Sequence, residues 1–166
     1  MRKILIAGAL LLAVIGFSLP AVAQDRLAAF QGGIGSQPFA RQGAAPGVIV
    51  ANDVQGVPPG GRPWVIEDLR ADIRVDGSIA VDGRGLLLAG GNNVGRNGGQ
   101  SVHARLFCGT VAHNSGTVPL EANGDFRIND VLSPVPPADC ATPTLLIVSG
   151  QAPAGNWFAA GIPKQP

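Results

Sequence analysis

The feature that most constrains this fold is a strict alternation of apolar and charged residues between positions 69 and 76. Four apolar residues alternate there with four charged ones: Leu69, Ala71, Ile73 and Val75 against Arg70, Asp72, Arg74 and Asp76. Because successive side chains of a strand point to opposite faces, this pattern predicts a strand with one buried face and one charged face. Asp76-Gly77 follows directly and is typical of a two-residue hairpin turn. We therefore expect an antiparallel hairpin with a second strand at Ser78–Val81.

The rest of the chain favours short strands over helices. It contains 24 Gly and 14 Pro, which disfavour long helices and favour tight turns. Ser101–Phe107 alternates again, and the apolar runs Leu86–Ala89 and Leu145–Val148 are typical of central strands covered on both faces. Residues 117–121 and 125–129 predict a further hairpin. The predicted fold is all-β, an antiparallel β-sandwich (Ig-like or related) of roughly seven to nine short strands, with a small β-barrel as the alternative.

The N-terminus has the three parts of a secretory signal peptide. Arg2 and Lys3 form a positive region, Ile4–Phe17 is apolar, and Ala21-Val22-Ala23 supplies a cleavage pattern of small residues. We expect a signal peptide over 1–23, cleaved between Ala23 and Gln24. The apolar run of about 14 residues is shorter than the ~20 needed to span a bilayer. The mature chain is therefore predicted to be secreted or periplasmic, without membrane insertion.

The segment that follows differs in composition from the rest of the mature chain. Residues 24–62 are dominated by Gly, Pro, Gln and Ala and show no sustained period. They predict a flexible leader, with a short strand at Val48–Ala51 and at most a brief helix at Arg26–Phe30. The β-sandwich domain is then expected over 63–166.

Net charge and aromatic content limit the classes of partner that the chain can bind. The chain has 12 basic and 11 acidic residues, and loss of Arg2 and Lys3 leaves a mature net charge of about −1. Such a balance gives no electrostatic footprint for nucleic acid or anionic lipid. Aromatic residues make up 5% of the chain and Tyr is absent. A sugar-binding aromatic platform is therefore poorly supplied, although Trp64 and Trp157 are available for one.

Cys108 and Cys140 are the two cysteines of the chain. Export would place them in an oxidising compartment, where a single pair has one intramolecular connectivity. Cys108 shares the parity of the inward residues of its strand, so its side chain is expected to point into the core. A bridge closing a loop of about 32 residues would stabilise the fold by roughly 3–4 kcal/mol. The sequence lacks a CxxC pair, which disfavours a redox role.

His103 and His113 are the two histidines, and neither fits a metal or catalytic motif. His103 falls on the outward face of its predicted strand together with Arg105, and His113 lies in the turn-like segment His113–Gly116. Their spacing is poor for a metal site, and the Asp and Asn residues elsewhere suit turns better than calcium loops. We predict that both histidines are solvated surface residues, with no catalytic residue, cofactor or metal.

Two local resemblances accompany these patterns. The segment Glu121–Leu132, with Asn123-Gly124 before Phe126, resembles one hairpin of carboxypeptidase-regulatory-like and related Ig-like domains. The elements Gly61-Arg62-Pro63-Trp64 and Trp157–Gly161 resemble those of small uncharacterised exported bacterial β-sandwich proteins. These resemblances imply an exported location and a sandwich fold, and they carry no activity or site.

The leading hypothesis is an exported, non-enzymatic binding or envelope-associated structural module, whose partner is a protein or an envelope component. One alternative is a small secreted hydrolase or metal-dependent enzyme that uses His103 or His113 with a carboxylate from a distant loop. A histidine within hydrogen-bond reach of Asp or Glu in a concave pocket would favour that alternative. Another alternative is a secreted inhibitor that presents the proline-rich loop Ser133–Pro137.

Overall fold

The computed structural model describes residues 25–40, 49–50, 52–150 and 152–164, and every regular element within them is a strand. The predicted signal peptide, with Ala23 and Gln24 at its cleavage site, lies outside the described residues. All strand ladders are antiparallel, which confirms the all-β antiparallel prediction. The strands are β1 (Arg26–Gly35), β2 (Phe39–Ala40), β3 (Ile49–Val50), β4 (Trp64–Val65), β5 (Asp68–Arg74), β6 (Ser78–Arg84), β7 (Leu87–Leu88), β8 (Ser101–Cys108), β9 (Val111–Asn114), β10 (Val118–Pro119), β11 (Phe126–Val131), β12 (Thr144–Ser149) and β13 (Trp157–Pro163).

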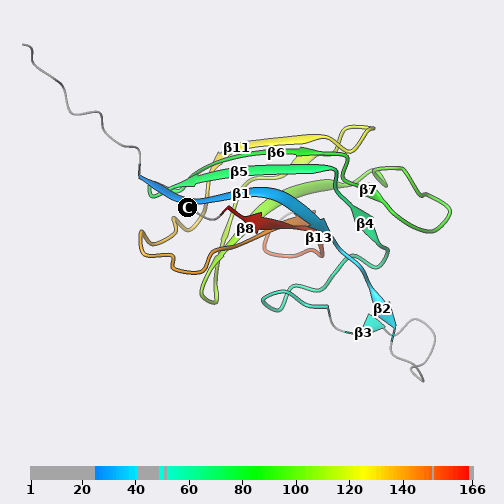
Figure 1. Ribbon diagram of the computed structural model, residues 1–166, viewed down its shortest axis with the longest axis horizontal. Helices are drawn as coiled ribbons and strands as arrows, with labels where there is room; N and C mark the ends of the chain where they lie inside the picture. Colours follow the sequence, from blue (N-terminus) through cyan, green and yellow to red (C-terminus); the bar gives the residue numbers. More distant parts are fainter. Residues whose placement is uncertain (1–24, 41–48, 51, 151, 165–166) are drawn as a thin grey trace, which may run out of the picture.

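Nine of these strands form one curled, barrel-like sheet (Figure 1). Its order is β10-β8-β12-β13-β1-β5-β6-β11, and β9 pairs with β8 on the edge that also carries β10. The two edges of the sheet meet: Asn114 and Ser133 exchange two backbone hydrogen bonds of 2.9 Å, and the Gly116 amide donates to the Asp130 carboxylate. One sheet of nine strands therefore supplies both walls of the core, at the upper end of the seven to nine strands expected.

The hairpin of β5 and β6 follows the sequence pattern. The side chains of β5 alternate between buried and exposed, and Ile73 pairs with Ile79 on β6. Gly77 closes the turn with a φ of 84°, a left-handed conformation that suits glycine. The predicted strand, turn and inward face are confirmed here.

The core fills the inside of the curled sheet and includes the predicted disulfide. Buried apolar residues from all the long strands form a single cluster, among them Phe30, Leu69, Leu106, Phe126 and Leu145. Cys108 at the end of β8 is bonded to Cys140, with an S–S distance of 2.01 Å, and both lie in this cluster. The bridge holds the loop before β12 against the core, as predicted.

The predicted leader is wrong where the structure describes it, because β1 lies in the middle of the main sheet. It pairs with β13 on one side and β5 on the other, and Phe30 is 2% exposed. The ladder to β13 is irregular between Phe30 and Gly33, which hides the strand period. The predicted helix at 26–30 is absent, and the domain begins well before residue 63.

The rest of that segment adds a second layer outside the sheet. Val57 and the half-buried Val54 pack against Phe107, Leu146 and Trp157 on the outer face of β8, β12 and β13. The Trp157 backbone bonds to Pro58 and to Gly60, and its indole donates to the Asn52 carbonyl at 3.0 Å. The predicted short strand at Val48–Ala51 is present at Ile49–Val50, paired with β2.

Two other predicted elements are placed differently. Of the apolar run Leu86–Ala89, Leu87–Leu88 pairs with β4 alone, outside the main sheet. The predicted hairpin over 117–129 turns at Gly124, but its strands separate. Because β10 pairs with β8 and β11 with β6, the two strands help to bring the edges of the curled sheet together.

Candidate functional site

The first candidate, His103, lies on the outer face of β8 as predicted but is fully buried. Its cross-strand partner is Val148, and that of the neighbouring Arg105 is Leu146, so both polar side chains point toward the second layer. Arg105 is 5% exposed. The prediction of a solvated histidine is wrong because the chain after β12 returns over this face and excludes water from it.

His103 and Arg105 fix that returning loop by its backbone. His103 Nδ1 donates to the Gly150 carbonyl at 2.8 Å, which leaves Nε2 of the neutral ring as an acceptor for the Arg105 guanidinium at 3.4 Å. Arg105 also donates to the Pro153 carbonyl and to Asn114 Oδ1, both at 2.7 Å. Both nitrogens of the ring are therefore committed to structural bonds.

Burial controls the charge of this network. Desolvation lowers the pKa of His103, and the nearby Arg105 charge lowers it further, against the Gly150 hydrogen bond that raises it. Desolvation likewise lowers the pKa of Arg105. Among the residues that the structure describes, no carboxylate lies within ion-pair distance of Arg105. Neutral acceptors alone therefore solvate this guanidinium.

His113 is also misplaced by the sequence analysis, because it lies on β9 and is 2% exposed. It pairs across the ladder with Leu106 and so shares the inward face. Its Nδ1 donates to the Pro134 carbonyl at 2.7 Å, while the buried Nε2 has no hydrogen-bond partner in the described part of the chain. His113 thus anchors the proline-rich loop Ser133–Pro137, whose Val135 remains exposed.

The enzyme alternative calls for a histidine beside a carboxylate, and the described residues show other partners for both histidines. Within residues 25–40, 49–50, 52–150 and 152–164, neither histidine bonds to a carboxylate. The same residues contain no group of three or more His, Cys, Asp or Glu side chains suited to a metal ion. They also contain no helix long and apolar enough to cross a membrane. His103 and His113 are best understood as parts of two structural networks.

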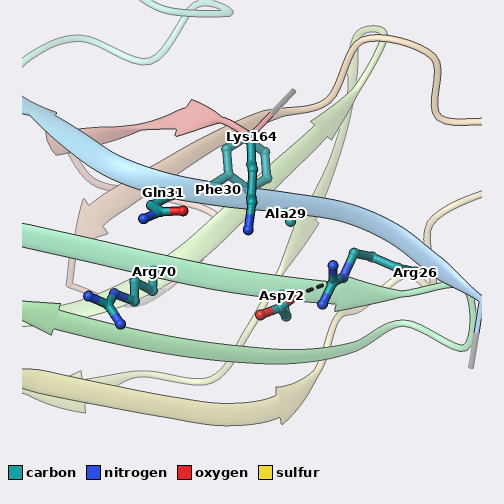
Figure 2. A pocket seen from close by; sticks show the side chains of 7 residues that line it. All are labelled: Arg26, Ala29, Phe30, Gln31, Arg70, Asp72 and Lys164. Atoms are coloured by element: carbon teal, nitrogen blue, oxygen red, sulfur yellow. Dashed lines mark ion pairs between the residues drawn. The ribbon is translucent and has the colours of Figure 1, made fainter. Parts of the chain in front are cut away.

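A groove of about 330 Å³ lies on the outer face of β1 and β5 (Figure 2). Figure 2 shows Lys164 crossing over β1, between Arg70 and the Arg26–Asp72 ion pair. The paired atoms of Arg26 and Asp72 are 2.8 Å apart, and Arg70 pairs with Asp68 at 3.2 Å. These side chains are largely exposed, so the groove is a solvated charged face of the kind predicted for this strand.

A larger groove, of about 430 Å³, is lined in part by Trp64 and Leu88. These residues belong to the separate two-stranded sheet of β4 and β7, which Figure 1 shows beside one end of the curled sheet. We call this groove the end groove. Its floor is the stacked pair of Trp64 and Phe158, whose ring centroids are 4.0 Å apart. Gly60 is required beside this pair, since a Cβ there would lie 2.9 Å from Trp64 Nε1 and 3.0 Å from Phe158 Cδ1. Residues from distant parts of the chain meet here, from 60–64, from 88–100, and from Ser149 and 156–158.

The walls of the end groove carry amide and hydroxyl side chains. The polar residues that line it are Arg62, Asn93, Gln100, Ser149 and Asn156. Arg62 is the one titratable side chain in this lining. The amides can donate and accept hydrogen bonds, but they cannot exchange protons with a substrate near neutral pH. This arrangement suits recognition of a ligand better than acid–base chemistry.

No family model, curated protein or solved structure matches this chain. The interpretation of the end groove therefore depends on its geometry and chemistry alone. Sequence reasoning did not predict it, although Trp64 was identified as one of two aromatic residues available for recognition. No local sequence pattern could have indicated the groove, because it forms only when strands that are distant in sequence bring its lining residues together.

Proposed function

We propose that this chain is an exported, non-enzymatic binding module that holds a component of the cell envelope in the end groove. The observation that carries the proposal is the lining of this groove: an aromatic floor, amide walls and one titratable residue, Arg62. A concave, partly apolar site with a few convergent polar groups is the usual form of a ligand pocket. The disulfide is in keeping with the export that the N-terminal sequence predicts.

The rigidity of the walls also supports binding. The Asn156 amide donates to the Pro59 carbonyl at 2.9 Å, and the Asn156 backbone and Ser149 bond to each other. His103 and Arg105 hold the intervening loop from below at Gly150 and Pro153. A pre-organised wall of this kind loses little conformational entropy when a ligand binds.

The proposal is tested by co-sedimentation of the purified mature protein with isolated envelope material from the cells that export it. We expect the wild-type protein to be retained, and a variant with Gln100→Ala and Asn156→Ala to lose most of that retention. The matched control carries Gln31→Ala and Asn129→Ala, which remove an amide pair from the exposed faces of β1 and β11. Equal retention of all three proteins would contradict the proposal, as would His103-dependent release of envelope fragments.

A further inference from the structure

Much of the backbone around the end groove is already paired, which leaves its side chains as the main source of hydrogen-bonding groups. The Gly60 amide donates to Trp157, the Leu88 amide to Arg96, and the Leu88 carbonyl accepts from Gly95. The Gln100 carbonyl accepts from Leu120. A peptide that binds by adding a strand needs free backbone groups at a sheet edge, and these groups of Gly60, Leu88 and Gln100 are already paired.

The free capacity lies in three amide side chains. Asn156 donates from Nδ2 to the Pro59 carbonyl, and Gln100 donates from Nε2 to the Gly98 carbonyl at 3.3 Å. The amide oxygen of each forms no hydrogen bond to the described residues. Asn93 forms no side-chain hydrogen bond to the described residues around the groove. A carboxamide donates and accepts at once, so these three groups match a ligand whose own groups also do both.

The charge of the lining residues and the apolar floor restrict the class of ligand further. One cation, Arg62, stands against no carboxylate in the lining, so a ligand with several anionic groups would meet too few counter-charges. Trp64, Phe158 and Leu88 form an apolar floor. Because Trp64 is 4% exposed, this floor offers a small area of apolar contact to C–H groups and not a broad stacking platform.

From the amide side chains of Asn93, Gln100 and Asn156 above the Trp64–Phe158 floor, we infer that the end groove binds a neutral saccharide. Each sugar hydroxyl is both donor and acceptor, and the C–H groups of the ring are apolar. The volume of about 430 Å³ falls within the range of ligand pockets. This inference rests on the proposed binding function and names the ligand class of the same site.

The test follows the side-chain amide signals of Asn93, Gln100 and Asn156 by NMR in the mature protein. The neutral probes are tetramers of β-1,4-linked glucose, β-1,4-linked N-acetylglucosamine and α-1,4-linked glucose. The comparison probes are an oligogalacturonate and an extended, uncharged peptide. We expect at least one neutral probe to shift these three signals saturably, while the other two classes leave them unchanged.

Variants tie the shifts to the groove. Gln100→Ala should weaken the affinity for the neutral probe by several-fold to about tenfold, the effect of losing one hydrogen bond, whereas Gln31→Ala should leave it unchanged. Asn156→Ala should weaken binding more, and its melting curve controls for the lost bond to Pro59. The inference is overturned if no neutral probe shifts the amide signals, if the acidic probe or the peptide shifts them instead, or if Gln100→Ala has no effect. Groove-dependent retention on envelope material would in that case leave the binding function standing and remove only the saccharide.

Discussion

The two halves of the curled sheet differ in the solvent exposure of their outer faces. On the half formed by β8, β12 and β13, the chain at 52–60, at Gly150 and at 152–156 covers the outer face and buries His103, Arg105 and Trp157. On the half formed by β5, β6 and β11, outward side chains stand in water, as Arg127 does at 74% side-chain exposure. We call these the covered half and the open half.

The comparison shows that one sequence pattern has two outcomes. Arg105 and Arg70 both alternate with apolar residues on a strand, and both point away from the core. Arg70 remains solvated, with Asp68 beside it, whereas Arg105 is enclosed and must be satisfied by the carbonyl of Pro153 and the amide of Asn114. The alternation of apolar and polar residues identifies the face of the strand on which a side chain lies. Whether that face is exposed to solvent depends on the path of segments that are distant in sequence.

The largest expected effect comes from removing the cover together with β1. A chain that begins at Pro63 loses the strand between β13 and β5, so two strand edges and the pocket of Phe30 are exposed. We expect no cooperative thermal unfolding, in contrast to a chain that begins at Gln24. This reverses the expectation, drawn from composition alone, that 24–62 is a flexible leader outside the domain. A folded, cooperative truncated chain, measured by circular dichroism, would remove β1 from the core.

Loss of the disulfide is expected to have the next largest effect on stability. Its Cys108 lies at the end of β8, in the covered half. Replacing both Cys108 and Cys140 with Ala should cost about 2–5 kcal/mol of unfolding free energy. The fold should survive partly, since a domain of this size buries a core without a crosslink. Urea denaturation of the mature protein measures the loss. Labelling of both cysteines in the native oxidised protein would show instead that the bridge is absent.

The next smaller effect is expected from replacing a buried arginine, compared with an exposed one. Arg105→Met should cost about 1–3 kcal/mol, because the Pro153 carbonyl and the Asn114 oxygen lose their donor. Arg127→Met, the matched change on the open half, should stay within about 0.5 kcal/mol. Parallel urea denaturation of the two variants decides the matter. Similar losses for both would mean that the two outer faces do not differ as described.

The smallest effect is expected for the ion pair in Figure 2. Asp72→Asn removes the partner of Arg26, and both side chains are more than half exposed, at 55% and 62%. Surface pairs of this kind contribute roughly 0–1 kcal/mol. We therefore expect a shift in melting temperature close to experimental error, further reduced by salt. A loss as large as that of Arg105→Met would show that the open half is not solvated.

The sequence predicted the elements whose environment is local. The hairpin at Asp76-Gly77, the inward position of Cys108 and the apolar strand at Leu145–Val148 follow from turn chemistry and alternation, and the structure has all of them. It failed where contacts are distant. Gly32 and Gly33 interrupt the period of β1, and nothing near His103 in sequence indicates that the loop at Gly150 will cover it.

The candidate site shows the same limit. Trp64 was identified as one of two aromatic residues available for recognition, but its pairing with Phe158 joins positions 94 residues apart. Single-residue patterns carry no information on such a pairing. The groove walls at Gln100 and Asn156 likewise meet only through the order of β8, β12 and β13 in the sheet.

The cover over His103 has a consequence for stability against pH. The pKa of His103 is lowered in the folded protein by burial and by Arg105, so the unfolded chain takes up this proton first as the pH falls. The contribution of neutral His103 to the unfolding free energy is therefore present above the unfolded value of about 6.5, and it is lost as the pH falls below that value toward the folded pKa.

The most direct test of the covered half is an NMR pH titration of the His103 ring in the mature protein. The account predicts a neutral ring with its proton on Nδ1, held by the Gly150 carbonyl, and a pKa below the ordinary value of about 6.5. A ring that titrates at the ordinary value, with its proton exchanging freely between the two nitrogens, would place His103 in solvent and contradict the account.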